Sequence, residues 1–309
     1  MKTQRFDLIG IGECMVELRG DVALGLATSL NCGYGGDVLN ALVAASRMGG
    51  RSGFVTRVGA DPFGASLLRK WQAEGVDLAH AKLIQGENGV YFISLSAGGE
   101  RDFTYRRHGS AASTMVPEDL DEGYIASAAC LLVSGITQAI SATAQATTLA
   151  ACAVAKRHGV RVAFDPNYRE RLWAGRGGLR AASAAMHEIL PYVDLMLPSY
   201  PSDAALLLRP CDSAASAAAQ FNDLGVELAQ KCGAQGSGLM LDGSYVEVAP
   251  ALASRVLDTT GAGDTWNGVY LLQRMNGVAA LVAAVTANQA AAEKLAHRGA
   301  IPEALVSTI

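Results

Sequence analysis

Short apolar runs rich in β-branched residues alternate along the chain with longer segments of helical periodicity. The runs predict buried strands at residues 6–12, 53–59, 130–136, 161–167 and 193–198. The longer segments predict helices at residues 37–48, 142–158 and 278–297. This alternation predicts an α/β fold in which a Rossmann-like, mostly parallel sheet is flanked by helices on both faces.

Two stretches interrupt the alternation. Residues 13–20 continue directly from the first strand, and residues 89–107 predict a hairpin whose two alternating runs are joined at residues 97–100. Such strands do not easily join a parallel sheet, so we expect a small β-sheet lid with strands within residues 13–34 and 87–109. The alternative is an antiparallel edge of the main sheet.

Composition narrows the classes of function. A chain of 309 residues, half of them hydrophobic, fits a single domain over residues 1–309. Only 17% of residues are charged and the net charge is −4, so a surface for nucleic acid is not expected. The sequence shows no signal peptide, no membrane-spanning run and no C-x-x-C pair, which favours a cytoplasmic protein with reduced cysteines and small-molecule partners.

The stretch DTTGAGDTWNG at residues 258–268 stands where a helical pattern begins. Unpaired amides and the helix dipole attract an anion at such a start, and Gly261 and Gly263 let the backbone come close to it. A carboxylate beside an anion hole needs a separate task, and accepting a proton from an attacking hydroxyl is such a task for Asp264. The alternative is an ordinary helix start at which Asp264 complements the dipole.

We expect the pKa of Asp264 to lie near its unperturbed value of about 3.9, with the helix start favouring the charged form. The carboxylate would then be ionised at neutral pH.

The string at residues 258–271, together with GYGGDVLNALVAASRMG at residues 33–49, resembles the paired signatures of the ribokinase-like (PfkB) carbohydrate kinases. The resemblance continues in order through residues 58–64, 134–137, 164–173, 231–236 and 298–302. Within the family, the stretches IGECMVEL, GGDVLN and DPNYRERLW look most like 2-keto-3-deoxygluconate kinases. The resemblance implies a ribokinase-like fold with a β lid, ATP and Mg²⁺ as cofactors, and a homo-oligomer.

The resemblance also assigns roles to residues. It makes Asp264 the catalytic base and Gly261, Ala262 and Gly263 the anion hole. Contacts to the substrate are implied for Gly35, Gly36, Asp37, Asn40, Tyr91, Tyr105, Arg107 and Arg169. Contacts to the nucleotide are implied for Asn167, Ser199, Lys231, Gly233, Gly236, Gly261, Gly263 and Asn288.

Several of these assignments have structural alternatives. Asp37 could cap a helix that follows a glycine loop, and Tyr91 could simply pack within the lid. Arg107 could be a solvated charge, and Lys231 a surface lysine at a strand end. Tyr105 and Arg107 are two residues apart and therefore share a strand face.

The arginines bear on the choice of substrate, because a guanidinium binds a carboxylate with two parallel hydrogen bonds and gains far less from a neutral sugar. The implied activity is the ATP-dependent phosphorylation of 2-keto-3-deoxygluconate by direct in-line transfer. Ser199 and Ser202 stand where many family members carry an Asn-x-x-Glu motif, which leaves the protein ligands of magnesium unassigned.

Three other functions remain open from the sequence. A kinase of a neutral sugar, such as fructose or ribose, would share the same residues. A non-catalytic sugar sensor would keep the fold, although the intact Asp264 speaks against it. A dinucleotide oxidoreductase is suggested by GIGECM after the first strand, but Met15 replaces the third glycine of its fingerprint.

Overall fold

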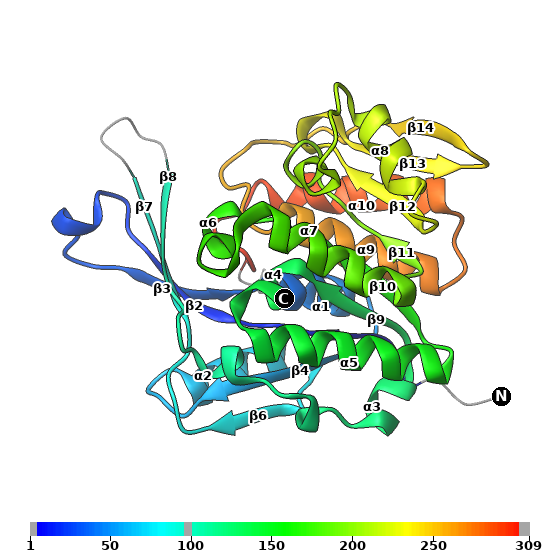
Figure 1. The fold of residues 1–309 in the computed structure, drawn as a ribbon. Helices are drawn as coiled ribbons and strands as arrows, with labels where there is room; N and C mark the ends of the chain where they lie inside the picture. Colours follow the sequence, from blue (N-terminus) through cyan, green and yellow to red (C-terminus); the bar gives the residue numbers. More distant parts are fainter. Residues whose placement is uncertain (1–4, 96–100, 303–309) are drawn as a thin grey trace.

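The computed structural model describes residues 5–95 and 101–302, and its main feature is a ten-stranded sheet (Figure 1). The strands of this sheet are β1 (Phe6–Ile11), β4 (Ser52–Gly59), β5 (Val76–Asp77), β6 (Ala81–Ile84), β9 (Ala128–Ser134), β10 (Arg161–Asp165), β11 (Leu195–Met196), β12 (Glu227–Lys231), β13 (Ser237–Leu241) and β14 (Ser244–Val248). Their order is β14-β13-β12-β11-β10-β9-β1-β4-β5, with β6 paired to β4. All neighbours from β12 to β5 are parallel, which confirms the predicted fold class.

The two antiparallel strands β13 and β14 at one edge were not predicted from the sequence. β13 pairs with β12 and β14 with β13, both antiparallel. Both strands are short: the apolar run in β13 spans only residues 238–241, and β14 is interrupted by the exposed Ser244 and Glu247.

Helices cover both faces of the sheet. The described helices are α1 (Asp37–Arg47), α2 (Gly64–Ala73), α3 (Glu122–Ala126), α4 (Gly135–Ile140), α5 (Ala142–His158), α6 (Glu170–Trp173), α7 (Gly178–Ile189), α8 (Ala214–Asn222), α9 (Ala262–Met275) and α10 (Ala280–Lys294). One buried cluster joins the sheet to α5, α7 and α8, and a second joins the other face to α1, α9 and α10. No helix in the described ranges is both long and apolar enough to cross a membrane.

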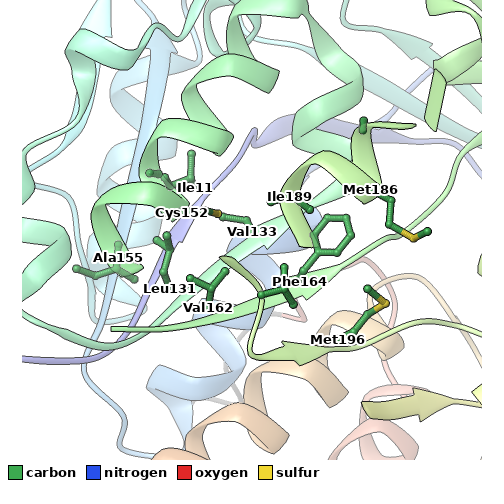
Figure 2. Close-up of a cluster of buried hydrophobic side chains, with 14 of the residues drawn as sticks. Ile11, Leu131, Val133, Cys152, Ala155, Val162, Phe164, Met186, Ile189 and Met196 are labelled. Atoms are coloured by element: carbon green, nitrogen blue, oxygen red, sulfur yellow. The ribbon is translucent and has the colours of Figure 1, made fainter. Parts of the chain in front are cut away.

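Alternation along β10 explains how one strand serves both clusters. Val162 and Phe164 face the first cluster, whereas Ala163 faces the second. Phe164 lies beside Met186 and Ile189 of α7 (Figure 2). A strand buried on both sides has no polar face at its centre, which is why residues 162–164 are all apolar.

The stretches that interrupt the alternation form a separate four-stranded sheet, which we call the lid sheet (Figure 1). Its strands are β2 (Met15–Arg19), β3 (Asn31–Gly35), β7 (Val90–Leu95) and β8 (Arg101–Arg106). The order is β3-β2-β7-β8, and β7 and β8 form the predicted antiparallel hairpin. The alternative of an antiparallel edge on the main sheet is therefore wrong, and the predicted turn at residues 97–100 lies outside the described residues.

Candidate active site

A cavity of about 750 Å³ lies between the lid sheet and the carboxyl ends of the main strands. This is the edge at which open parallel sheets usually bind ligands. The predicted site residues that line the cavity are Gly35, Gly36, Asp37, Asn40, Tyr91, Tyr105, Arg107, Asn167, Arg169, Ser199, Lys231, Gly261, Gly263 and Asp264. Four predicted residues are not among the lining residues: Gly233, Gly236, Ala262 and Asn288.

The start of α9 places Asp264 in this cavity. Gly261 is the N-cap residue and has a φ of 78°, in the left-handed region that glycine adopts without strain. A side chain there would bring its Cβ within 2.7 Å of the carbonyl oxygen of Ala300. The Gly261 carbonyl accepts the amide of Thr265 at 2.9 Å, so the helix begins here and Asp264 lies in its first turn.

The three predicted amides of the anion hole are not equivalent. The amide of Ala262 donates to the carbonyl of Thr259 at 3.2 Å and therefore closes the turn. Gly261 and Gly263 line the cavity at the positive end of the helix dipole. These two glycines are where an anionic group can approach the backbone.

Asn40 holds the carboxylate of Asp264. Its Nδ2 donates to Oδ2 of Asp264 at 2.7 Å, although the two residues are 224 positions apart in the chain. Its Oδ1 accepts the amide of Gly36 at 3.3 Å, which fixes the orientation of the side-chain amide. Asn40 was predicted to bind sugar hydroxyls; the structure places it in the cavity lining and against the proposed base.

The expectation that Asp264 keeps an ordinary pKa is wrong. Burial, followed by repulsion from Asp37, raises the pKa of Asp264 to about 7, and Asp165 adds to the rise. The hydrogen bond from Asn40 and the charge of Lys231 act in the opposite direction. The residue as a whole is only half-buried, but the packing around its carboxylate outweighs the favourable helix start.

Asp37 opens α1 and connects two parts of the site. Its Oδ2 accepts hydrogen bonds from Oγ of Ser134 and, at 3.0 Å, from Nδ2 of Asn167. Burial is the main cause that raises the pKa of Asp37, and the nearby Asp165 adds to it. Asn167, which was predicted for the nucleotide, thus lies beside a residue that was predicted for the sugar.

The lid wall carries a buried ion pair that sequence reasoning missed. The guanidinium of Arg107 pairs with Glu13, whose side chain is 1% exposed, and Ser110 donates to the same carboxylate at 2.5 Å. Arg107 is itself mostly buried, so the alternative of a solvated charge is wrong. The only signal for Glu13 was an acid directly after the first strand, which says nothing about its partner.

Two tyrosines of the lid hairpin stack at the cavity. The rings of Tyr91 and Tyr105 are 5.9 Å apart at an angle of 28°, and Tyr105 is 46% exposed. Tyr91 is buried and donates its hydroxyl to Glu17 at 2.5 Å. Tyr105 is therefore the tyrosine with an exposed surface for a ligand.

Arg169 follows β10 on the opposite wall. It is exposed, lines the cavity and donates from Nη1 to the carbonyl of Tyr168 at 3.0 Å. Within the part of the chain that the structure describes, Arg169 has no ion pair with a carboxylate. Its charge is available to an anionic ligand.

The segment after β11 offers no carboxylate to a metal. Asp203 is fully buried and accepts the amides of Ser199 at 2.6 Å and Tyr168 at 2.7 Å. Burial raises its pKa to about 6. Residues 5–95 and 101–302 contain no cluster of three or more His, Cys, Asp or Glu side chains that could hold a metal ion.

Asn288 is committed to the packing of α9 and α10. Its Oδ1 accepts from Nε1 of Trp266 at 2.8 Å, and its Nδ2 donates to the carbonyls of Val248 and Ala249. Both N–H groups of the Asn288 amide are thus committed to the protein, so a donation to a nucleotide would require one of these bonds to break.

Lys231 is 7% exposed, so the alternative of a surface lysine is wrong.

Comparison with known proteins identifies the family and the fold. The model of the pfkB family carbohydrate kinases matches residues 6–306. A 2-dehydro-3-deoxygluconokinase of Dickeya dadantii is 32% identical over 94% of this chain and 95% of its own. A fructokinase of Klebsiella pneumoniae is 33% identical over 83% of this chain and 80% of its own. The solved structure of a PfkB protein from Polaromonas sp. superimposes with a TM-score of 0.84 at 26% identity, over 96% of this chain and 97% of that one.

Proposed function

The chain belongs to the pfkB family of carbohydrate kinases, and from this membership we propose that it phosphorylates a sugar acid with ATP. The proposed substrate is 2-keto-3-deoxygluconate, another name for 2-dehydro-3-deoxygluconate, and the product is its 6-phosphate. One observation carries the proposal: the carboxylate of Asp264, held by Asn40, faces a cavity whose other wall presents the unpaired guanidinium of Arg169 among the described residues.

The proposed reaction is a direct in-line transfer. The sugar hydroxyl attacks the γ-phosphorus, a new O–P bond forms, and the bond from that phosphorus to the ADP oxygen breaks. Asp264 accepts the proton of the hydroxyl, and a pKa of about 7 is close to the optimum for a base at neutral pH. The amides at Gly261 and Gly263 stabilise the negative charge on the transferred group.

A sugar carboxylate fits the distribution of charge in the cavity. Arg169 can bind it with two parallel hydrogen bonds, and the exposed ring of Tyr105 can pack against the carbon chain. The carboxylate of Glu13 already balances the charge of the Arg107 guanidinium. Arg107 therefore shapes the lid wall and donates hydrogen bonds from its remaining N–H groups. We therefore assign the carboxylate to Arg169 first.

Magnesium would enter this site with the nucleotide. The carboxylates of Asp165 and Asp203 are already engaged in hydrogen bonds, and the described residues offer no cluster of metal ligands. Mg²⁺ commonly keeps several waters and binds through substrate phosphates, where it neutralises their charge. The chain would contribute the helix start that positions those phosphates.

ADP formation across a panel of sugars and sugar acids, with ATP and Mg²⁺ present, tests the proposal. We expect kcat/KM for 2-keto-3-deoxygluconate to exceed that for fructose and for ribose by about 10-fold or more, which corresponds to one charge-assisted hydrogen bond. If fructose were turned over faster, the proposed substrate would be a neutral sugar and not a sugar acid. Sugar binding without any ADP formation would identify a non-catalytic sensor.

A neutral-sugar kinase is the second candidate. The similarity to a fructokinase supports it. The ion pair of Arg107 with Glu13 supports it as well, because of the two arginines predicted to bind a carboxylate only Arg169 then has no ion pair in the described part of the site. The panel separates the two candidates directly.

We further propose that the lid sheet joins two copies of the chain. The connection between β2 and β3 exposes Val22, Leu26 and Leu30, and Leu26 is 77% exposed. Burial of such side chains at an interface would be favourable. Light scattering should give the mass of an oligomer, and Leu26→Asp should lower that mass; a monomeric mass for the unmodified chain would contradict the proposal.

A further inference from the structure

Lys231, the last residue of β12, has no hydrogen-bond donor to spare. Its ammonium group donates to Oδ2 of Asp165 at 2.9 Å, to the carbonyl of Leu197 at 2.5 Å and to Oδ1 of Asn267 at 2.9 Å. A lysine ammonium has three N–H donors, so the set is complete. A contact with a nucleotide phosphate would require one of these buried bonds to break.

The partners of Lys231 connect the sheet to the helix that carries the proposed base. Asp165 ends β10, and its Oδ2 also accepts Nδ2 of Asn267 at 2.5 Å. Asn267 lies three residues after Asp264 in α9, so the two side chains lie on neighbouring positions of one helix face. Lys231, Asp165 and Asn267 thus form a closed, buried triangle directly behind the first turn of α9.

The same ammonium supplies positive charge among several acids. Asp264 faces Asp37 from α1, Asp165 from β10 and Lys231 from β12, and its hydrogen-bond partner Asn40 is neutral. Two further charged groups lie one step away: Asp203, from the 3₁₀ turn Ser202–Leu207, interacts with Asp165 and Lys231, and Arg107, after β8, interacts with Asp37.

We propose that Lys231 is a positioning residue for phosphoryl transfer, which fixes the first turn of α9 through Asn267 and Asp165 and balances the acids around the base. The inference rests on the proposed function, because Asp264 acts as a base only if a hydroxyl is phosphorylated. It replaces the sequence-based assignment of Lys231 to the nucleotide. Gly263 adds support, because a Cβ built there would lie 3.6 Å from Cδ of Lys231, in ordinary contact.

The variant Lys231→Met tests the role by removing the charge while keeping the length of the side chain. We expect kcat at pH 7 to fall about 10-fold or more and the acid limb of the kcat profile to move up by about one pH unit, while KM for ATP changes less than about threefold. An exposed lysine at the far end of α5 gives the control Lys156→Met, which should match the unmodified enzyme.

Two results would overturn the proposal. A rise of about 10-fold or more in KM for ATP, with an unmoved acid limb, would make Lys231 a nucleotide contact. Unchanged kcat, KM and pH profile would remove it from catalysis altogether.

A paired variant separates charge from folding. Lys231→Met alone leaves the buried carboxylate of Asp165 unbalanced, whereas Lys231→Met with Asp165→Asn removes both charges. We expect the double variant to recover most of the lost melting temperature and to return the acid limb towards that of the unmodified enzyme. A limb that stays displaced would contradict the electrostatic part of the proposal.

If Lys231→Met does not fold, Asn267→Ala carries the test. This variant removes the link to α9 and keeps the charge, so kcat should fall while the acid limb moves by less than about half a pH unit. Normal kcat for Asn267→Ala would contradict the positioning role.

Failure of the proposed function can be recognised separately. An unmodified enzyme that forms no ADP with any sugar would refute the kinase proposal. The network would still be tested by the melting temperatures and by the carboxyl ¹³C titration of Asp264, which should shift to higher pH in Lys231→Met.

Discussion

Asp264 occupies a place where its negative charge is disfavoured. Packing around its carboxylate and the facing charges of Asp37 and Asp165 raise its pKa to about 7. A weakly acidic group accepts a proton more readily than an ordinary aspartate does. The surroundings of Asp264 therefore favour proton transfer at the expense of the charged form.

Replacement of this residue gives the first prediction. We expect Asp264→Asn to lower kcat by about 10²- to 10⁴-fold, because the amide keeps the hydrogen bond from Asn40 but cannot accept a proton. Coupled ADP detection measures kcat, and calorimetry should show sugar affinity within about threefold. The exposed loop residue Asp212, changed to Asn, is the control. Near-normal turnover of Asp264→Asn would exclude it as the base.

Arg169 gives the second prediction. Because its guanidinium is exposed at the cavity, we expect Arg169→Ala to lower kcat/KM for the keto acid by about 10- to 100-fold, as loss of a charge-assisted pair does. Fructose, if it is turned over at all, should lose less than about threefold. Arg180→Ala, on the exposed side of α7, should change neither value. Equal losses of kcat/KM on both substrates would show that Arg169 does not bind the carboxylate of the keto acid.

At the scale of elements, the start of α9 separates two roles of glycine. Gly261 needs its left-handed φ for the turn, whereas a Cβ at Gly263 would clash with nothing, since it would make only an ordinary contact, 3.6 Å from Cδ of Lys231. The space beside Gly263 opens into the cavity. A substitution at Gly263 therefore tests the ligand site without disturbing the fold.

We expect Gly263→Ala to keep the melting temperature within about 3 °C, since alanine is the better helix former, and to lower kcat/KM for ATP about 10-fold or more. Differential scanning fluorimetry and steady-state kinetics measure the two quantities. Gly175→Ala, whose new methyl group meets nothing within 4 Å, is the matched control outside the cavity lining. Unimpaired kinetics in Gly263→Ala would place the phosphate elsewhere.

The elements themselves could be read from local pattern. The helix predicted at residues 142–158 is α5, Ala142–His158, because Ser141 caps its start and Gly159 ends it in the left-handed conformation. The strand predicted at residues 6–12 is β1, Phe6–Ile11, and its neighbours β4 and β9 were predicted from apolar runs in the same way. The edge strand β14 escaped prediction because its polar and partly exposed residues give no such run, and β13 because its apolar run, residues 238–241, is only four residues long.

The partners of the site residues could not be read in the same way. The bond between Asn40 and Asp264, the ion pair of Arg107 with Glu13 and the triangle around Lys231 all join distant segments. A single sequence gives the type of each side chain but not which distant group satisfies it. The raised pKa of Asp264 escaped prediction for the same reason, since its causes come from α1 and β10.

At the scale of the whole molecule, the buried acids make stability depend on pH. An unfolded aspartate has a pKa of about 3.9, so between pH 4 and 7 folded Asp264 holds a proton that the unfolded chain has lost. Its contribution to stability is complete below pH 4 and is lost as pH rises through about 7. Asp203, with a pKa raised to about 6, acts in the same direction.

We therefore expect Asp264→Asn to melt at a higher temperature than the unmodified protein at pH 8 and at nearly the same temperature at pH 4.5. Thermal unfolding followed by circular dichroism at the two pH values measures the difference. A variant that is less stable at pH 8 would mean that the ionised carboxylate stabilises the fold.

The bond between Asn40 and Asp264 also has a consequence during synthesis. The acid is added to the growing chain more than two hundred residues after the amide that holds it, when most of α9, all of α10 and the end of the chain are still to be made. By then every strand of the lid sheet and of the central sheet has been made, but the proposed base is still missing from the chain. Under the proposed role of Asp264, unfinished copies therefore lack the group that accepts the proton of the sugar hydroxyl.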